Sequence, residues 1–466
     1  MNWFNLIVVL FAVNAAVVIV MENRRPADTL AWLSVLLCLP FVGLLLYFFF
    51  GKRAIRPLMK ADDLATLKTN VEPLASPVSE KDDYTTLIDF LHNNNHAYLT
   101  DGNRLDLYTS FSDMLQHLLK DIEAATDHIH FQFFKFEDDE LGRHISNLLV
   151  EKVRQGVEVR VIYDAAANWN ISIAFYRQLK DNGVEVQPFN RILPFLTSFS
   201  NYRNHRKVVV IDGKVGYMGG MNIAERYLKG IRTGIWRDTH FRIVGPAVEE
   251  MQIAFLSDWY FASKQFLSAQ RYFPGLSEEQ TTEGAKIQIV TSNPADQWNV
   301  MEHSLALLIA QTKDYIWLQS PYFIPTDVIM NTLCSVALAG KDVRIMLPAQ
   351  GDKGILVPKA TFSYLDRALS AGIRVFLYDA GYMHAKTIVT DNRVSTIGSV
   401  NIDPRSLKLS FEINAFIYDE DIALRQRAIF EHDMLECHEL DLATWRHRSF
   451  WERLVESFAR LFAPLF

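Results

Sequence analysis

One set of reactive residue types occurs twice in this 466-residue chain with the same spacing, His-x-Lys-x-x-x-x-Asp. The residues that make up the two motifs are His205, Lys207, Asp212, His384, Lys386 and Asp391. Each motif continues into a small-residue turn that ends in an asparagine, Asn222 in the first copy and Asn401 in the second. A repeat of this length indicates two related halves that share one active site.

Both motifs are expected to lie along strands, because residues 208–211 and 387–390 are rich in β-branched side chains and are bounded by turn residues. Side chains two positions apart on a strand point to the same face, so each histidine and its lysine should face one pocket. All six motif residues form the candidate catalytic set. Within it, Asp212 and Asp391 fall at the turns that end the strands, where we expect them to hold the loops through backbone hydrogen bonds.

A pocket of this composition is suited to an anion. The predicted phosphate-binding residues are Lys207, Asn222, Lys386, Ser399 and Asn401. Lysine ammonium groups and amide donors can stabilise the extra negative charge of a five-coordinate phosphorus. Histidine titrates near neutral pH, so one imidazole can attack phosphorus while the other protonates the leaving oxygen. We therefore expect a covalent phosphohistidine and two half-reactions, with no metal and no cofactor.

These motifs resemble those of the phospholipase D superfamily, in which two such motifs meet between two similar halves. The resemblance implies that His205 is the nucleophile and His384 the general acid and base, although the reverse assignment stays open. It also implies that a carboxylate orients each histidine, and the matching positions are Asp238 and Glu412. The alternative for these carboxylates is a plain ion pair with a nearby arginine such as Arg237.

The duplication extends upstream of the motifs and predicts the fold. Strand, helix, strand, helix, strand patterns cover residues 129–189 and 316–378, and glycines at 156, 183, 340 and 372 end the helical runs. The fold class is therefore α/β, with two similar phospholipase D-type lobes that form a pseudo-dimer. We place the lobes at residues 96–270 and 284–440, with a polar linker at 271–283.

The N-terminal residues 1–60 predict a transmembrane helical hairpin, with charge-free apolar spans at about 3–21 and 31–50. A cleaved signal peptide is the alternative for the first span. Basic residues Lys52, Arg53, Arg56 and Lys60 follow the second span, so both ends should be cytoplasmic. Residues 61–95 are expected to be a linker. The three scattered cysteines indicate no disulfide framework.

Residues 441–466 predict an amphipathic interfacial helix, because apolar residues recur at helical spacing opposite charged ones. Packing of this helix onto the lobes is the alternative. The formal net charge of −7 leaves no basic domain to follow a nucleic-acid backbone, so the phosphodiester substrate is expected to be lipid-borne.

From end to end, the chain resembles the bacterial cardiolipin synthases of the phospholipase D type. Residues 25–51, the Ser-Pro-Tyr-Phe-Ile-Pro segment at 320–325 and the terminal Phe-Ala-Pro-Leu-Phe carry this likeness. It implies phosphatidyl transfer between two phosphatidylglycerol molecules, giving cardiolipin and glycerol, by a multi-pass protein of the bacterial inner membrane. Three alternatives remain: a hydrolytic phospholipase D or phosphodiesterase that releases phosphatidic acid, transfer that uses phosphatidylethanolamine, and a non-catalytic membrane-anchored scaffold.

Overall fold

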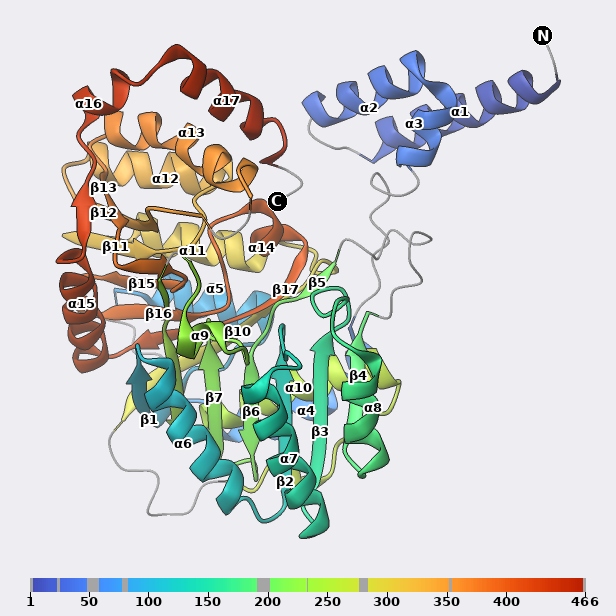
Figure 1. The fold of residues 1–466 in the computed structure, drawn as a ribbon, viewed down its shortest axis with the longest axis vertical. Coiled ribbons are helices and arrows are strands. Elements are labelled where there is room, and N and C mark those ends of the chain that lie inside the picture. The colour runs from blue at the N-terminus through green and yellow to red at the C-terminus, as the bar shows by residue number, and fades with distance from the viewer. Residues whose placement is uncertain are drawn as a thin grey trace. The chain divides into compact units, whose positions relative to one another are not determined.

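The computed structural model describes residues 3–22, 26–47, 58–77, 83–190, 202–232, 234–275, 284–351 and 354–463. These residues fall into two compact units. One unit holds the described residues up to 47 together with 190 and 202–203, and the other holds the rest. Each is described by itself (Figure 1).

The N-terminal unit contains α1 (Trp3–Met21), α2 (Pro26–Cys38) and α3 (Pro40–Leu46). Within the second expected span, at 31–50, the described residues form two helices that are separated at Leu39. Pro40 has no backbone N–H and disfavours helical geometry in the residue before it, so α2 ends and α3 begins there. Residues 48–50 of that span lie outside the described residues. Within the described ranges, no helix combines the length and the apolar character needed to cross a bilayer.

The larger unit is built from two lobes with the same order of elements. The first lobe contains β1 (Thr100–Tyr108), α6 (Phe111–Ala124), β2 (His128–Phe133), α7 (Glu140–Arg154), β3 (Glu158–Asp164), α8 (Ile173–Asp181), β4 (Glu185–Phe189), β6 (Val208–Ile211), β7 (Val215–Gly219), α9 (Arg226–Lys229), β9 (His240–Val244) and α10 (Ala247–Ser263). The second lobe contains β10 (Ala285–Ser292), α11 (Val300–Ala310), β11 (Tyr315–Gln319), α12 (Asp327–Leu338), β12 (Asp342–Pro348), α13 (Leu356–Ser370), β13 (Arg374–Tyr378), β15 (Thr387–Thr390), β16 (Val394–Gly398), α14 (Pro404–Lys408), β17 (Ser410–Tyr418) and α15 (Glu420–Met434). Each element of the first lobe therefore has a counterpart in the second.

Short elements lie between or after these. They are η2 (Glu72–Leu74), β5 (Arg203–Asn204), β8 (Ile235–Arg237), η4 (Gln270–Tyr272), β14 (Gly381–Met383), β18 (Cys437–Glu439), α16 (Leu442–Arg446) and α17 (Phe450–Arg460). The glycines expected to end helical runs, at 156, 183, 340 and 372, all take positive φ values between 85° and 89°. That conformation confirms their predicted role as helix stops.

A single mixed sheet runs through both lobes (Figure 1). Its strand order is β18-β13-β12-β11-β15-β16-β17-β10-β1-β9-β7-β6-β2-β3-β4. The outer strands β2, β3 and β4 are parallel, as are β11, β12 and β13, and the strands between them are antiparallel. The lobes join where β1 pairs with β10. The predicted α/β fold with two similar lobes is thereby confirmed.

Helices cover both faces of this sheet, so its strands are buried on both sides. In β6, Val209 and Ile211 pack into the core under α6, α7 and α8, whereas Val208 and Val210 pack against α10. This alternation is what a strand with two buried faces requires. It fixes the register of the strand that follows the first motif.

The described residues of the expected linker at 61–95 form packed structure. They contain α4 (Ala61–Lys68) and α5 (Thr85–Asn95). The side chains of Leu87, Ile88 and Leu91 on α5 are almost fully buried in the core of the second lobe. Their spacing places them on one helical face, which explains the docking. In the expected linker at 271–283, Tyr272 and Phe273 are also buried, and residues 276–283 lie outside the described residues.

Candidate active site

The two motifs adopt matching local structures. His205 and Lys207 immediately precede β6, and His384 and Lys386 immediately precede β15. Each lysine ammonium group donates a hydrogen bond to the backbone carbonyl of its own histidine. Both lysine side chains are buried. The charge of each lysine is therefore held beside its histidine, away from bulk solvent.

Each histidine is paired with a carboxylate from the other lobe. His205 Nδ1 lies 3.1 Å from Glu412 Oε2, and His384 Nδ1 lies 2.6 Å from Asp238 Oδ2. Both carboxylates are fully buried. The structure thus brings Asp238 and Glu412 to the histidines. The Asp238 carboxylate contacts His384, and the Arg237 side chain donates to the backbone carbonyl of Asp238 rather than to its carboxylate.

Backbone hydrogen bonds between the lobes explain this crossed arrangement. The N–H of His205 donates to the carbonyl of Phe411, the residue before Glu412, at 2.9 Å. The N–H of His384 donates to the carbonyl of Arg237, the residue before Asp238, at 2.7 Å. In addition, β8 pairs with β14 in parallel. Each histidine is therefore placed by the chain segment that carries its partner carboxylate.

The pKa values of the two carboxylates are shifted in opposite directions. Burial alone would raise the pKa of Asp238, but the positive charges of Lys386 and His384 outweigh it and lower that pKa to about 2. For Glu412, burial prevails over Lys207 and the hydrogen bond from Ser399, and it raises the pKa to about 7. Lys386 also acts on Glu412. His205 of the first motif also contacts Glu412 and the Ser399 carbonyl, both from the second lobe, so residues of the two lobes meet in one site.

The residues that surround the two carboxylates also differ in size between the lobes. The equivalent positions are Gly220 and Ser399, Tyr227 and Ser406, and Asp238 and Glu412. A Cβ atom at Gly220 would lie 2.1 Å from Asp238 Oδ1, so no side chain fits there, and Tyr227 fills the space instead. In the second lobe, the hydroxyl groups of Ser399 and Ser406 both hydrogen-bond the longer Glu412.

Tyr227 is a site residue that the sequence did not reveal. Its hydroxyl oxygen lies 3.1 Å from His384 Nδ1 and 3.3 Å from Asp238 Oδ2, in a fully buried position. Aromatic rings also flank the histidines: Phe134 lies edge-on to His205, with ring centroids 4.8 Å apart, and Trp236 lies 4.8 Å from His384. No spacing rule connects these residues to the motifs, because each comes from a different element.

The predicted phosphate-binding residues beyond the lysines take different roles. The Ser399 hydroxyl is engaged by Glu412 and by the Ile413 backbone. Asn222 Oδ1 accepts a hydrogen bond from the Lys135 N–H at 3.1 Å. Asn401 is buried in the equivalent turn of the second lobe. Asn222 and Asn401 are therefore buried in equivalent turns, whereas the Ser399 hydroxyl is engaged by Glu412.

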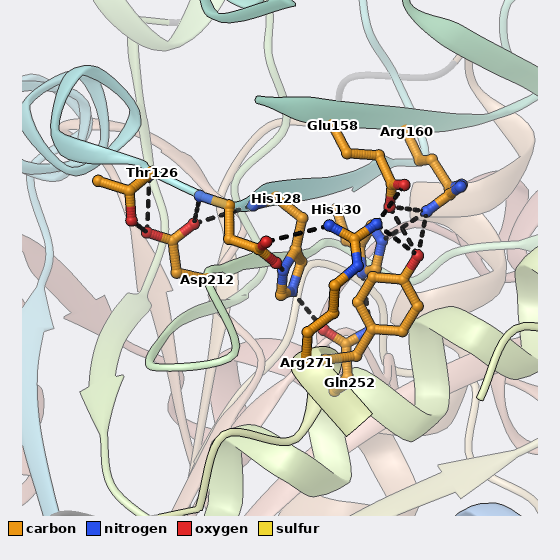
Figure 2. A network of polar contacts seen from close by, with 10 residues as sticks. Thr126, His128, His130, Glu158, Arg160, Asp212, Gln252 and Arg271 are labelled. Atoms are coloured by element: carbon orange, nitrogen blue, oxygen red, sulfur yellow. Dashed lines mark hydrogen bonds and ion pairs between the residues drawn. The ribbon is translucent and has the colours of Figure 1, made fainter. Parts of the chain in front are cut away.

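The motif aspartates lie at the opposite ends of their strands from the histidines. The Asp212 carboxylate accepts hydrogen bonds from the backbone N–H groups of Thr126, Asp127 and His128, at 2.8 to 2.9 Å, and Figure 2 shows it against Thr126. Asp391 accepts equivalent bonds from residues 313–315. These contacts match the loop-holding role expected for both aspartates, and their place in the catalytic set stays a prediction.

Their backbone conformation gives the reason for aspartate at these positions. Asp212 and Asp391 have positive φ values of 53° and 54°, as do the residues that follow them, Gly213 and Asn392. Two successive positive φ values make the hairpin turn whose twist matches the flanking strands. Asp and Asn tolerate this conformation better than most residues.

The contacts around Asp212 continue into a polar network at the same end of the first lobe (Figure 2). Arg160 bonds Glu158 and the Tyr272 hydroxyl, and Arg271 bonds Asp127 at 3.0 Å. This network secures η4 to the sheet. In the described ranges, no group of three or more His, Cys, Asp or Glu side chains is arranged to hold a metal ion.

Arg206, which follows the first histidine, connects the lobes beneath the site. It is almost completely buried, bonds Asp258 Oδ1 at 2.8 Å, and donates to the carbonyls of Glu412 and Ser292 in the second lobe. Arg206 is therefore a buried structural link between the lobes.

Comparison with known proteins agrees with this geometry. The family model described as "Cardiolipin synthase, PLD-like domain" matches residues 118–259 and 305–434, one segment in each lobe. The model described as "Phospholipase_D-nuclease N-terminal" matches residues 7–52. The crystal structure of phosphatidylserine synthase from Haemophilus influenzae superposes with a TM-score of 0.61 at 17% identity, over 82% of this chain and 100% of that one. That likeness shows the fold.

Curated relatives match over nearly the full length. The major cardiolipin synthase of Bacillus subtilis is 37% identical, over 97% of this chain and 96% of its own. The cardiolipin synthase of Staphylococcus aureus strain Mu50 is 37% identical, over 97% of this chain and 94% of its own. With its paired His-Lys motifs, crossed carboxylates and matching length, this chain belongs to the cardiolipin synthase family of phospholipase D-like proteins.

Proposed function

We propose that the protein transfers a phosphatidyl group from one phosphatidylglycerol to another, giving cardiolipin and glycerol through a phosphatidyl-histidine intermediate. The observation that carries this proposal is the pair of crossed His–carboxylate contacts beside two buried lysines, in a chain whose full-length relatives are named cardiolipin synthases. Two histidines in one site supply a nucleophile and a proton donor, which is what two sequential displacements at phosphorus require.

His205 is suited to be the nucleophile because of its tautomer. Its Nδ1 lies 2.9 Å from the backbone carbonyl of Ser399, which can only accept a hydrogen bond. Nδ1 must therefore carry the proton, and the lone pair of Nε2 is left for attack. Below pH 7 the nearby Glu412 is largely neutral and does not favour an imidazolium at this position.

His384 is suited to be the acid and base. Its Nδ1 contacts Asp238, whose lowered pKa keeps it ionised, and an anion in that position stabilises the imidazolium that proton uptake creates. The Lys386 ammonium group, 2.9 Å from the same nitrogen, opposes a permanent positive charge. His384 can therefore release its proton as well as hold it.

In the first half-reaction, His205 Nε2 attacks the phosphorus of phosphatidylglycerol. The bond from phosphorus to the glycerol oxygen breaks, and His384 delivers its proton to that oxygen. In the second half-reaction, His384 takes the proton from the terminal hydroxyl of another phosphatidylglycerol. Its oxygen attacks phosphorus, the P–N bond to His205 breaks, and cardiolipin leaves. Lys207 and Lys386 balance the charge on the phosphoryl oxygens in both steps.

We further propose that the N-terminal segment anchors the lobes to the cytoplasmic face of the bacterial inner membrane. Residues 3–21 contain no charged side chain, and the chain after position 50 is basic, with Lys52, Arg53 and Arg56. Residues 7–52 match the family model described as "Phospholipase_D-nuclease N-terminal", which supports a shared origin of this segment with the N-terminal segments of that family. Lipid packing at the membrane would exclude water, which competes with the second lipid and would release phosphatidic acid.

The test is incubation of the purified, detergent-solubilised protein with labelled phosphatidylglycerol in the absence of metal, followed by lipid separation. His205→Ala and His384→Ala are assayed in parallel. Cardiolipin and free glycerol that disappear in both variants would support the proposal. Phosphatidic acid alone would replace the transferase with a hydrolase, and a lack of turnover with any phospholipid would favour the scaffold.

A chemical trap distinguishes the two histidines. Quenching during turnover with a denaturing detergent at mildly alkaline pH, where the P–N bond of a phosphohistidine survives, should leave labelled phosphatidyl groups on His205 of the wild type. His384→Ala should accumulate less label than the wild type but on the same residue, because the leaving glycerol goes unprotonated. Label on His384 would reverse the assignment.

A further inference from the structure

Helix α17 packs onto the second lobe through its charged side. The Glu456 side chain, only 3% exposed, accepts a hydrogen bond from Arg448 at 2.7 Å and lies 3.8 Å from Lys359 of α13. Ala459 and Ala463 on the same side of the chain are buried as well. The inner side of this helix therefore consists of one carboxylate and two small residues.

The opposite side of α17 is apolar and exposed. Its residues are Phe450, Trp451, Leu454, Val455, Phe458 and Leu461, which are 44% to 72% exposed. At about 100° per residue, all of them project from the half of the helix that faces away from Glu456. An amphipathic helix on a soluble surface normally buries its apolar stripe, so this orientation is inverted. An exposed apolar surface of this extent marks an interaction site.

The composition of this surface fits a lipid bilayer. Aromatic and aliphatic side chains form its centre. Arg453 and Arg460 are exposed along one edge of it, about 40° to 60° around the helix from Glu456, where their long side chains can reach anionic phosphates. The helix also has its own start signal, a capping box between Ser449 and Glu452, so its formation does not depend on covering the apolar side.

α17 also connects to the active site through a short series of contacts. Ala459 and Ala463 pack against Ile324. The Ile324 N–H donates to the carbonyl of Ile402 at 2.8 Å, and Ile402 directly follows Asn401, the asparagine of the second motif. The inner side of α17 is therefore joined, through Ile324, to the segment that carries the second turn of the site.

We propose that α17 is a docking surface for an anionic bilayer, and that it holds the catalytic lobes against the lipid that supplies their substrates. The use of this contact in catalysis rests on the proposed function. The binding of α17 to lipid does not depend on turnover. The N-terminal segment anchors the chain, and α17 sets which side of the lobes meets the membrane.

Photo-crosslinking tests the contact itself. Benzoylphenylalanine replaces Phe458 in the full-length protein, which is reconstituted into vesicles of phosphatidylglycerol and phosphatidylcholine. The control places the same probe at Arg154, whose side chain is 65% exposed on α7. We expect lipid adducts at position 458 and none at 154. Adducts between two protein chains, or no adduct at 458, would overturn the proposal.

Activity measurements on matched leucines test the consequence. Leu461 and Leu338 are 72% and 73% exposed, but Leu338 ends α12, far along the chain from α17. Leu461→Ser combined with Trp451→Ser should lower turnover of vesicle phosphatidylglycerol about tenfold and leave turnover of monomeric short-chain phosphatidylglycerol within about twofold. Leu338→Ser should change neither. Equal losses of turnover on both substrates would contradict a docking role. A wild-type protein that is inactive but still forms lipid adducts at position 458 would refute only the proposed transferase activity.

Discussion

Glu412 and Asp238 contact equivalent histidines, but their pKa values are shifted in opposite directions. Glu412 has its pKa raised to about 7, so it is neutral below that pH and ionised above it, whereas Asp238 stays ionised. A carboxylate that ionises next to His205 Nδ1 strengthens the hydrogen bond from that nitrogen and makes Nε2 a better nucleophile. Turnover should therefore depend on the charge of Glu412.

We predict that the turnover number rises as pH increases through about 7, and that Glu412→Gln removes this rise and lowers turnover above pH 7 by about one to two orders of magnitude. The measurement is kcat between pH 5.5 and 8.5 on phosphatidylglycerol. Gln keeps the size of the side chain, so a retained rise near pH 7 in this variant would assign the titration to another group.

Tyr227 gives a second prediction at this scale. Tyr227→Phe removes the hydroxyl between Asp238 and His384, and we expect kcat to fall about tenfold with KM unchanged, because the position of the acid is altered and lipid binding is not. Tyr176→Phe is the control, since its buried hydroxyl bonds the carbonyl of Phe136 away from the histidines. A rise in KM without a fall in kcat would place Tyr227 in substrate binding.

At the scale of elements, the motif aspartates join strand ends. Asp212 ties the β6–β7 turn to the start of β2, and backbone hydrogen bonds lower its pKa against the opposing effect of burial. The ionised form is thus favoured by folding, and the stabilisation is complete above the usual pKa of 3.8 and is lost as pH falls below it.

We predict that Asp212→Asn lowers the free energy of unfolding by about 1–3 kcal/mol at pH 7, with a smaller difference from wild type at pH 3. Thermal melting of the detergent-solubilised protein measures this. Activity per folded molecule should stay within about twofold. A large loss of kcat with an unchanged melting temperature would return Asp212 to the chemistry.

The elements also show how far the sequence could be interpreted. The two motifs, the helix-ending glycines and the repeated strand order predicted both lobes, because these signals are local and occur twice. The helix α5 and the burial of Arg206 were not predictable, since both depend on contacts between residues far apart in the chain. The two carboxylates were identified by their order, but their crossed partners follow from pairing between lobes, which no periodicity records.

At the scale of the whole molecule, a shared sheet and a buried ion pair join the two lobes. One sheet continues from β1 to β10, and Arg237 of the first lobe forms a buried two-point ion pair with Asp433 of the second, at 2.6 and 3.0 Å. Both side chains are less than 10% exposed. Loss of one partner would leave an uncompensated charge between the lobes.

We predict a single unfolding transition for the two lobes, which Asp433→Asn shifts as a whole by about 3–5 kcal/mol. Glu439→Gln is the control, because Glu439 forms an equally direct pair with Arg374 that is about 40% exposed, and it should cost no more than about 1 kcal/mol. Calorimetry measures the number of unfolding transitions and their shift in each variant. Two separate transitions in the wild type, or equal shifts in both variants, would contradict the prediction.

The crossed histidine–carboxylate contacts have a consequence for biosynthesis. When the first lobe leaves the ribosome, its His205 has no Glu412 and its Asp238 has no His384, since both partners lie later in the chain. A truncated or half-translated protein therefore carries no complete half of the catalytic machinery. Both histidine–carboxylate contacts can form only after the second lobe has been synthesised and has folded against the first.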